Sequence, residues 1–95
     1  MNLTSHELKE QGNKLFASGD YTGAEQQYTL AIQKSSSNPL LFTNRAFARI
    51  KLQRWEDVMA DCLHSIELTG HGPNYKAFYY LGRHGAEYSR VSVPG

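Results

Sequence analysis

An internal repeat with a period of 34 residues is the feature that most constrains the fold of this 95-residue chain. Eight apolar or small positions of the first copy recur in the second. In the first copy they are Leu8, Gly12, Phe16, Tyr21, Ala24, Tyr28, Ala31 and Ile32. In the second copy they are Phe42, Ala46, Ile50, Trp55, Val58, Cys62, Ser65 and Ile66. A unit of this length holds two helices and buries its apolar face by stacking on its neighbours, so the period predicts a helical array.

Capping signals and apolar spacing predict the first two helices. Thr4 and Glu7 match the Ser/Thr-x-x-Glu capping box, and the helix that they open is expected to run to about Ser18, before a Gly-Asp break. A second helix is predicted over residues 21–34, because its apolar side chains recur at helical spacing.

The third helix is predicted over residues 39–52. Asn38 can cap it, and Pro39 fits its first turn, where a missing N–H group costs nothing. At about 100° per residue, the side suited to packing carries Phe42, Ala46 and Ile50. The nearly opposite side carries an amide, a ring and an ammonium group that packing does not require, from Asn44, Phe47 and Lys51.

The rest of the chain adds helices and no predicted strand, so the predicted class is all-α, a helical solenoid of two complete helix-turn-helix repeats plus a fifth helix. The fourth helix is expected over residues 55–69, ended by Gly70. The fifth is expected over residues 75–88, weakened by Gly82 and Gly85. The predicted parts are an N-terminal arm, a first repeat, a second repeat with its following loop, the first helix of a third repeat and a mobile tail, over residues 1–4, 5–38, 39–74, 75–88 and 89–95.

Composition narrows the possible functions. A formal net charge of +1 gives no general attraction to nucleic acid or to an anionic membrane. Neither a signal peptide nor a run of about 20 apolar residues is found, so we expect a cytoplasmic or nuclear protein.

Cys62, the single cysteine, excludes an internal disulfide and falls at a core position, which favours packing over nucleophilic chemistry. The histidines are scattered, and we expect no catalytic residue, metal, cofactor or small-molecule substrate.

The period is that of tetratricopeptide repeats, and several segments resemble the tetratricopeptide domain of CHIP-type co-chaperone ubiquitin ligases. The similar segments are residues 8–13 (LKEQGN), 43–46 (TNRA), 61–62 (DC), 66–68 (IEL) and 76–82 (KAFYYLG). The resemblance covers about residues 5–83 and is more specific for a chaperone-binding tetratricopeptide domain than for the ligase.

In each repeat, one face of the first of its two predicted helices carries a row of polar side chains, which we call its polar line. Stacked repeats place these first helices side by side along one concave surface. Ammonium groups and amide donors converging there would suit a ligand with closely spaced carboxylates. The resemblance implies a carboxylate clamp for the C-terminal Glu-Glu-Val-Asp tail of cytosolic heat-shock chaperones of the seventy- and ninety-kilodalton classes. By resemblance, the residues that grip the terminal carboxylate and the last aspartate are Lys9, Asn13, Asn44 and Lys76, with Lys51 contributing. Those expected to contact the apolar residues upstream are Phe47, Tyr79 and Tyr80, and Arg83 completes the third line.

Other interpretations stay open. Lysines on helices are usually solvated, and Asn44 could simply cap or bridge within its repeat. The resemblance ends after Gly82, and no U-box segment is found among these residues, so this chain alone is not expected to transfer ubiquitin. The alternatives are a fragment of a CHIP-like ubiquitin ligase whose catalytic U-box lies elsewhere, and a tetratricopeptide scaffold for a partner other than a chaperone.

Overall fold

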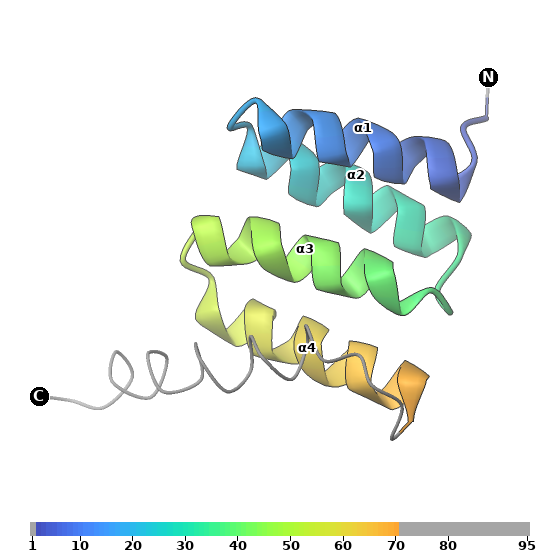
Figure 1. The fold of residues 1–95 in the computed structure, drawn as a ribbon, viewed down its shortest axis with the longest axis vertical. Helices are drawn as coiled ribbons and strands as arrows, with labels where there is room; N and C mark the ends of the chain where they lie inside the picture. The colour runs from blue at the N-terminus through green and yellow to red at the C-terminus, as the bar shows by residue number, and fades with distance from the viewer. Residues whose placement is uncertain (1, 71–95) are drawn as a thin grey trace, which may run out of the picture.

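The computed structural model describes residues 2–70, which form four helices stacked side by side (Figure 1). Their bounds are α1 Ser5–Ala17, α2 Tyr21–Lys34, α3 Pro39–Lys51 and α4 Trp55–Thr69. All four predicted helices are confirmed, with ends within one residue of those expected. The predicted fifth helix over residues 75–88 and the predicted tail over residues 89–95 lie outside the described residues.

Side-chain caps fix the beginnings of three helices. Thr4 and Glu7 form the predicted capping box, in which the Thr4 hydroxyl accepts from the Glu7 backbone N–H and the Glu7 carboxylate accepts from that of Thr4, at 3.1 and 3.0 Å. Asp20 caps α2 through the Gly23 N–H, and Asn38 caps α3 through a backbone N–H of its first turn. Each cap contributes about 1 kcal/mol, since it satisfies an N–H group that has no partner within the helix.

Tight turns separate the helices. Gly19, between α1 and α2, has a φ of +90°, and Gly70, at the end of α4, has a φ of +65°. A side chain would be strained at such angles, whereas glycine adopts them readily. Because each turn is short, consecutive helices run antiparallel, and α1 and α3, the first helices of the two repeats, run in the same direction (Figure 1).

The core runs along the seams between consecutive helices, with α1 on α2, α2 on α3 and α3 on α4. Its buried apolar residues fall in three clusters: Leu8, Ala31 and Leu41; Ala24, Tyr28 and Ala48; Ala46, Val58 and Cys62. The packing face expected for α3 is confirmed, since Phe42 and Ala46 are buried and Ile50 packs against the third cluster. Tyr21 and Trp55, expected in the core, are only half-buried.

A small residue sets the approach of α1 to α2. A methyl group on Gly12 would lie 2.6 Å from Cε1 and 2.8 Å from Cδ1 of Tyr28, which is closer than carbon atoms pack. The Tyr28 ring therefore packs directly on the backbone of α1. No described helix, within residues 2–70, is long and apolar enough to cross a membrane.

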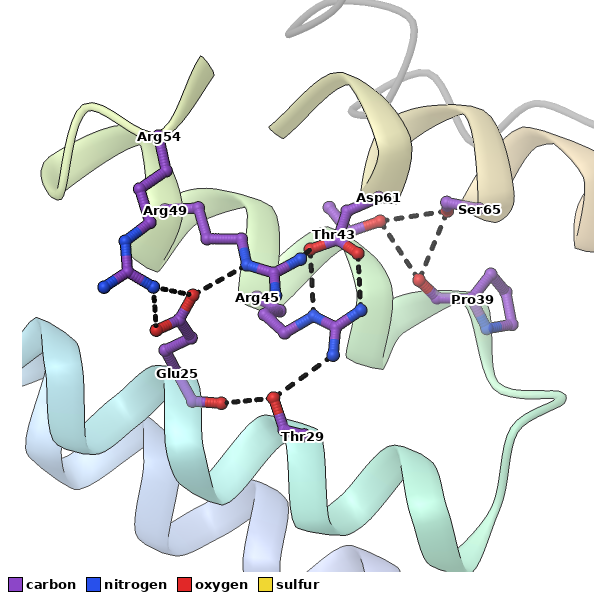
Figure 2. A network of polar contacts seen from close by, with 9 residues as sticks. All are labelled: Glu25, Thr29, Pro39, Thr43, Arg45, Arg49, Arg54, Asp61 and Ser65. Carbon is purple, nitrogen blue, oxygen red and sulfur yellow. Dashed lines mark hydrogen bonds and ion pairs between the residues drawn. The ribbon is translucent and has the colours of Figure 1, made fainter. Parts of the chain in front are cut away.

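An ionic network that the sequence analysis missed joins α2, α3 and α4 (Figure 2). Asp61 accepts from Arg45 at 2.7 and 3.0 Å and from Arg49 at 2.8 Å. Glu25 accepts from Arg49 at 2.7 Å and from Arg54 at 2.8 and 3.0 Å. Burial acts to lower the pKa of Arg49, but its bond to Glu25 and the charges of Asp61 and Glu25 outweigh burial and raise it. Arg49 thereby bridges a carboxylate of the first repeat to one of the second.

Candidate functional site

Two parallel helices supply the candidate site. On α1, Lys9, Asn13 and Phe16 follow the i, i+4, i+7 spacing that aligns side chains along one face. On α3, Asn44, Phe47 and Lys51 follow the i, i+3, i+7 spacing of a single face in the same way.

An open cavity of about 210 Å³ lies where these two faces meet. Its lining residues are Asn13 and Phe16 of α1, Tyr28 of α2, and Asn44 and Phe47 of α3. The structure thus brings together three of the predicted site residues, Asn13, Asn44 and Phe47. We call this the α1–α3 cavity; it offers two primary amides beside a mainly apolar floor.

The Asn13 amide of the α1–α3 cavity is held by a hydrogen bond from a core residue. The Tyr28 hydroxyl donates a hydrogen bond to Oδ1 of Asn13, with 2.5 Å between the oxygens. Only 2% of Tyr28 is exposed, and its burial, with a smaller contribution from the charge of Glu10, raises its pKa to about 12. The hydroxyl is therefore protonated, and a donor, throughout the neutral range.

Two predicted cations lie one helical turn from the lining residues. Lys9 precedes Asn13 by one turn on α1, and its Nζ lies 3.9 Å from Oε1 of Glu10. Lys51 follows Phe47 by one turn on α3, and its Nζ lies 6.0 Å from the centroid of the Tyr21 ring. Neither lysine lines the α1–α3 cavity in the described part of the chain. Along the two parallel helices, Lys9 lies on the N-terminal side of the lining residues and Lys51 on their C-terminal side.

The site residues predicted in the third repeat are Lys76, Tyr79, Tyr80 and Arg83. All four lie outside the described residues.

Sequence analysis did not assign Phe16 or Tyr28 to the site. Phe16 could have been found, because it follows Asn13 by three residues and so shares its helix face. Tyr28 carried no such signal, since its ring belongs to the core as predicted and only its hydroxyl reaches Asn13.

The described residues offer little else for chemistry. Cys62 is buried, and its surroundings, together with the charge of Asp61, raise its pKa to about 11, so the thiol stays protonated near neutral pH. Over residues 2–70, no group of three or more His, Cys, Asp or Glu side chains is arranged to hold a metal ion.

The chain is similar to solved tetratricopeptide domains over most of its length. The second such domain of Spaghetti (RPAP3), bound to the HSP90 peptide SRMEEVD, superposes with a TM-score of 0.85 at 33% sequence identity, covering 93% of this chain and 80% of that one. The first domain of the same protein, bound to the same peptide, gives a TM-score of 0.78 at 34% identity and covers 90% and 65%. No family model matches the sequence.

Curated relatives show the same likeness over a small part of their own length. Human tetratricopeptide repeat protein 12 is 33% identical over 86 residues, which is 90% of this chain and 12% of that protein. The STIP1 homolog of Dictyostelium discoideum is 37% identical over 82 residues, 81% of this chain and 14% of that protein. The chain thus spans about an eighth of the length of these relatives. It belongs to the tetratricopeptide-repeat family, as its period and fold indicate.

Proposed function

We propose that this chain is an adaptor module that binds the acidic C-terminal tails of cytosolic heat-shock chaperones of the seventy- and ninety-kilodalton classes. The observation that carries the proposal is the pairing of Asn13 and Asn44 across one cavity between two parallel helices. Two tetratricopeptide domains of the same fold, at 33% and 34% identity, are bound to an HSP90 peptide that ends in Glu-Glu-Val-Asp. The likeness to a STIP1 homolog agrees with this role.

The chemistry of the tail fits the α1–α3 cavity. A C-terminal aspartate brings two carboxylates within a few ångströms, and a carboxylate accepts hydrogen bonds without donating any. The amino groups of Asn13 and Asn44 can donate to them, while Phe16 and Phe47 offer apolar contact to the residue before. Lys9 and Lys51 add positive charge at either end, where it attracts the upstream glutamates. By resemblance, Lys76, Tyr79, Tyr80 and Arg83 complete this site.

A calorimetric titration of the full 95-residue chain with the peptide Ser-Arg-Met-Glu-Glu-Val-Asp tests the proposal. A few charge-assisted bonds, less the cost of ordering a flexible tail, predict a Kd on the order of micromolar. The same peptide with an amidated C-terminus loses one carboxylate and should bind at least tenfold more weakly. Equal affinity for both peptides, or no binding to either, would overturn the proposed clamp.

The wider role that we propose is that of a cytoplasmic co-chaperone module in protein quality control. The segment of residues 76–82 favours kinship with CHIP-type ubiquitin ligases, and a U-box in the same gene product would establish it. The alternative is a scaffold for a different partner. It is supported by the 41% identity over 61 residues to dynein axonemal assembly factor 4 of Mus musculus. Competition by free Glu-Glu-Val-Asp peptide for the partner isolated with this chain separates the two, because a scaffold for another partner would be unaffected.

A further inference from the structure

The hydrogen bond between Tyr28 and Asn13 joins a core residue to a candidate ligand-binding group. We propose that Tyr28 is a positioning residue, whose hydroxyl holds Oδ1 of Asn13 toward the core so that Nδ2 is presented to a ligand carboxylate. This inference rests on the proposed function and extends it to the residue that orients one of the two amides.

Orientation matters because a primary amide has two chemically opposite ends. Nδ2 donates hydrogen bonds and Oδ1 accepts them, so a 180° flip of the Asn13 side chain would set its oxygen against the ligand carboxylate. The two oxygens would repel each other, and a favourable contact would become an unfavourable one. The Tyr28 hydroxyl selects the productive orientation, because its proton requires an acceptor and Oδ1 supplies it.

The Tyr28 hydroxyl is itself held in place by packing. Its ring belongs to the buried cluster of Ala24 and Ala48, with Leu15 and Phe16 packed alongside. One edge of the ring packs on the backbone of α1 at Gly12. A methyl group added to Gly12 would lie 2.6 Å from Cε1 of the ring. A ring so enclosed cannot swing its hydroxyl away from Asn13 without opening the seam between α1 and α2.

The second repeat lacks the pair formed by Tyr28 and Asn13. One period after Tyr28 the chain carries Cys62, and one period after Asn13 it carries Phe47. Cys62 is buried in the cluster of Ala46 and Val58 and is not among the residues that line the cavity. Of the two repeats that the structure describes, the first is therefore the one in which a core hydroxyl, that of Tyr28, holds a site amide, that of Asn13.

The test removes the hydroxyl alone. Tyr28→Phe keeps the ring and should weaken binding of the Ser-Arg-Met-Glu-Glu-Val-Asp peptide about three- to tenfold. The matched control is Thr22→Ala, which removes a hydroxyl from an exposed position of the same helix, and it should leave the Kd within twofold. Circular dichroism should show the same helix content for all three proteins at the temperature of the titration.

A double-mutant cycle separates positioning from a general structural effect. If Tyr28 acts through Asn13, Tyr28→Phe should cause no further loss in an Asn13→Ala background, because the group that it orients is gone. The side-chain NH₂ resonances of Asn13 should also shift in peptide-free Tyr28→Phe. An equal loss in both backgrounds, or an affinity within twofold of the parent, overturns the positioning role and leaves the clamp standing. A parent chain that does not bind the peptide overturns both. If Tyr28→Phe loses helix content, NMR of the unsubstituted chain decides instead: a Tyr28 hydroxyl proton that exchanges slowly and lies close to Asn13 supports the positioning role, and a freely exchanging one overturns it.

Discussion

The two sides of α3 use polar residues in opposite ways. On one side, Asp61 and Glu25 are almost fully buried and accept hydrogen bonds from three arginines (Figure 2). The charges of the ionic network are therefore paired with one another within the fold. On the other side, Asn13 and Asn44 line the open α1–α3 cavity. Arg45 and Asn44 are neighbours in sequence, yet one holds the repeats together and the other faces the α1–α3 cavity.

This difference means that stability and binding should separate by face. Breaking a buried ion pair leaves its partner charged and unpaired in a region of low polarity, which costs several kcal/mol. Removing the Asn44 amide at the edge of the open cavity leaves no described buried group without its partner, so the stability of the fold should change little, whereas removing the Asn13 amide also takes the acceptor from the Tyr28 hydroxyl. Substitutions on the two sides of one helix should therefore give opposite profiles.

Asp61→Ala should have the largest effect on the fold. It leaves Arg45 and Arg49 without their shared carboxylate and should lower the free energy of unfolding by about 3–5 kcal/mol, enough to unfold much of so small a domain. Urea denaturation followed by circular dichroism measures the loss. Asp57→Ala, an exposed carboxylate in the first turn of α4, is the matched control and should cost less than about 1 kcal/mol. Similar losses for the two variants would show that the ionic network is not a major source of stability.

Asn44→Ala should have the reverse profile. We expect at least a tenfold rise in the Kd for the acidic tail peptide, since one charge-assisted bond contributes about 1.5–3 kcal/mol. The urea midpoint should stay nearly constant, because Asn44 lies at the edge of the open cavity. The control is Gln11→Ala, which removes an exposed amide from the opposite side of α1. If the two variants bind equally well, the α1–α3 cavity is not the binding site.

Gly12→Ala should affect both properties, because Gly12 packs against the Tyr28 ring, which belongs to the core and also lines the α1–α3 cavity. Alanine favours a helix over glycine by about 1 kcal/mol, so any net loss of stability measures the clash with the Tyr28 ring. We expect a net loss of about 1–2 kcal/mol and a weaker affinity for the peptide. A gain in stability would mean that α1 and α2 separate easily, and that the Tyr28 hydroxyl is not rigidly placed.

The smallest effect should come from alkaline pH. Cys62 has a pKa of about 11 in place of 9.0, and Tyr28 has one of about 12 in place of 10.0, because burial disfavours their anions. The folded state then binds more protons than the unfolded state above pH 9, so stability is fully present below that pH and falls as pH rises toward 11. The loss should be about 1–2 kcal/mol by pH 10, measured by urea denaturation. Cys62→Ala should reduce this dependence, and an unchanged slope would contradict the assignment to the thiol.

Much of this fold is predictable because its signals are local. Capping residues, a turn glycine and apolar spacing each act within a few residues, and they placed every described helix. The convergence of Asn13, Asn44 and Phe47 also followed from sequence, because a repeated structure puts equivalent helices side by side.

The ionic network and the role of Tyr28 depend on contacts between helices, and these could not be read from sequence. A charged residue in a helix is normally solvated, so nothing in the sequence marks Asp61 as the partner of Arg45, 16 positions away. In the same way, helical periodicity assigns the Tyr28 ring to the core without showing where its hydroxyl ends.

Arg49 has a consequence for how the array unfolds. Because a single guanidinium group binds Glu25 of the first helix pair and Asp61 of the second, neither pair can melt without releasing a charge that the other has buried. In a linear array, such a shared contact raises the coupling between adjacent units relative to the stability of each unit alone. We therefore expect residues 2–70 to unfold in one concerted transition, with amide protons of α1 and α4 exchanging at similar free energies.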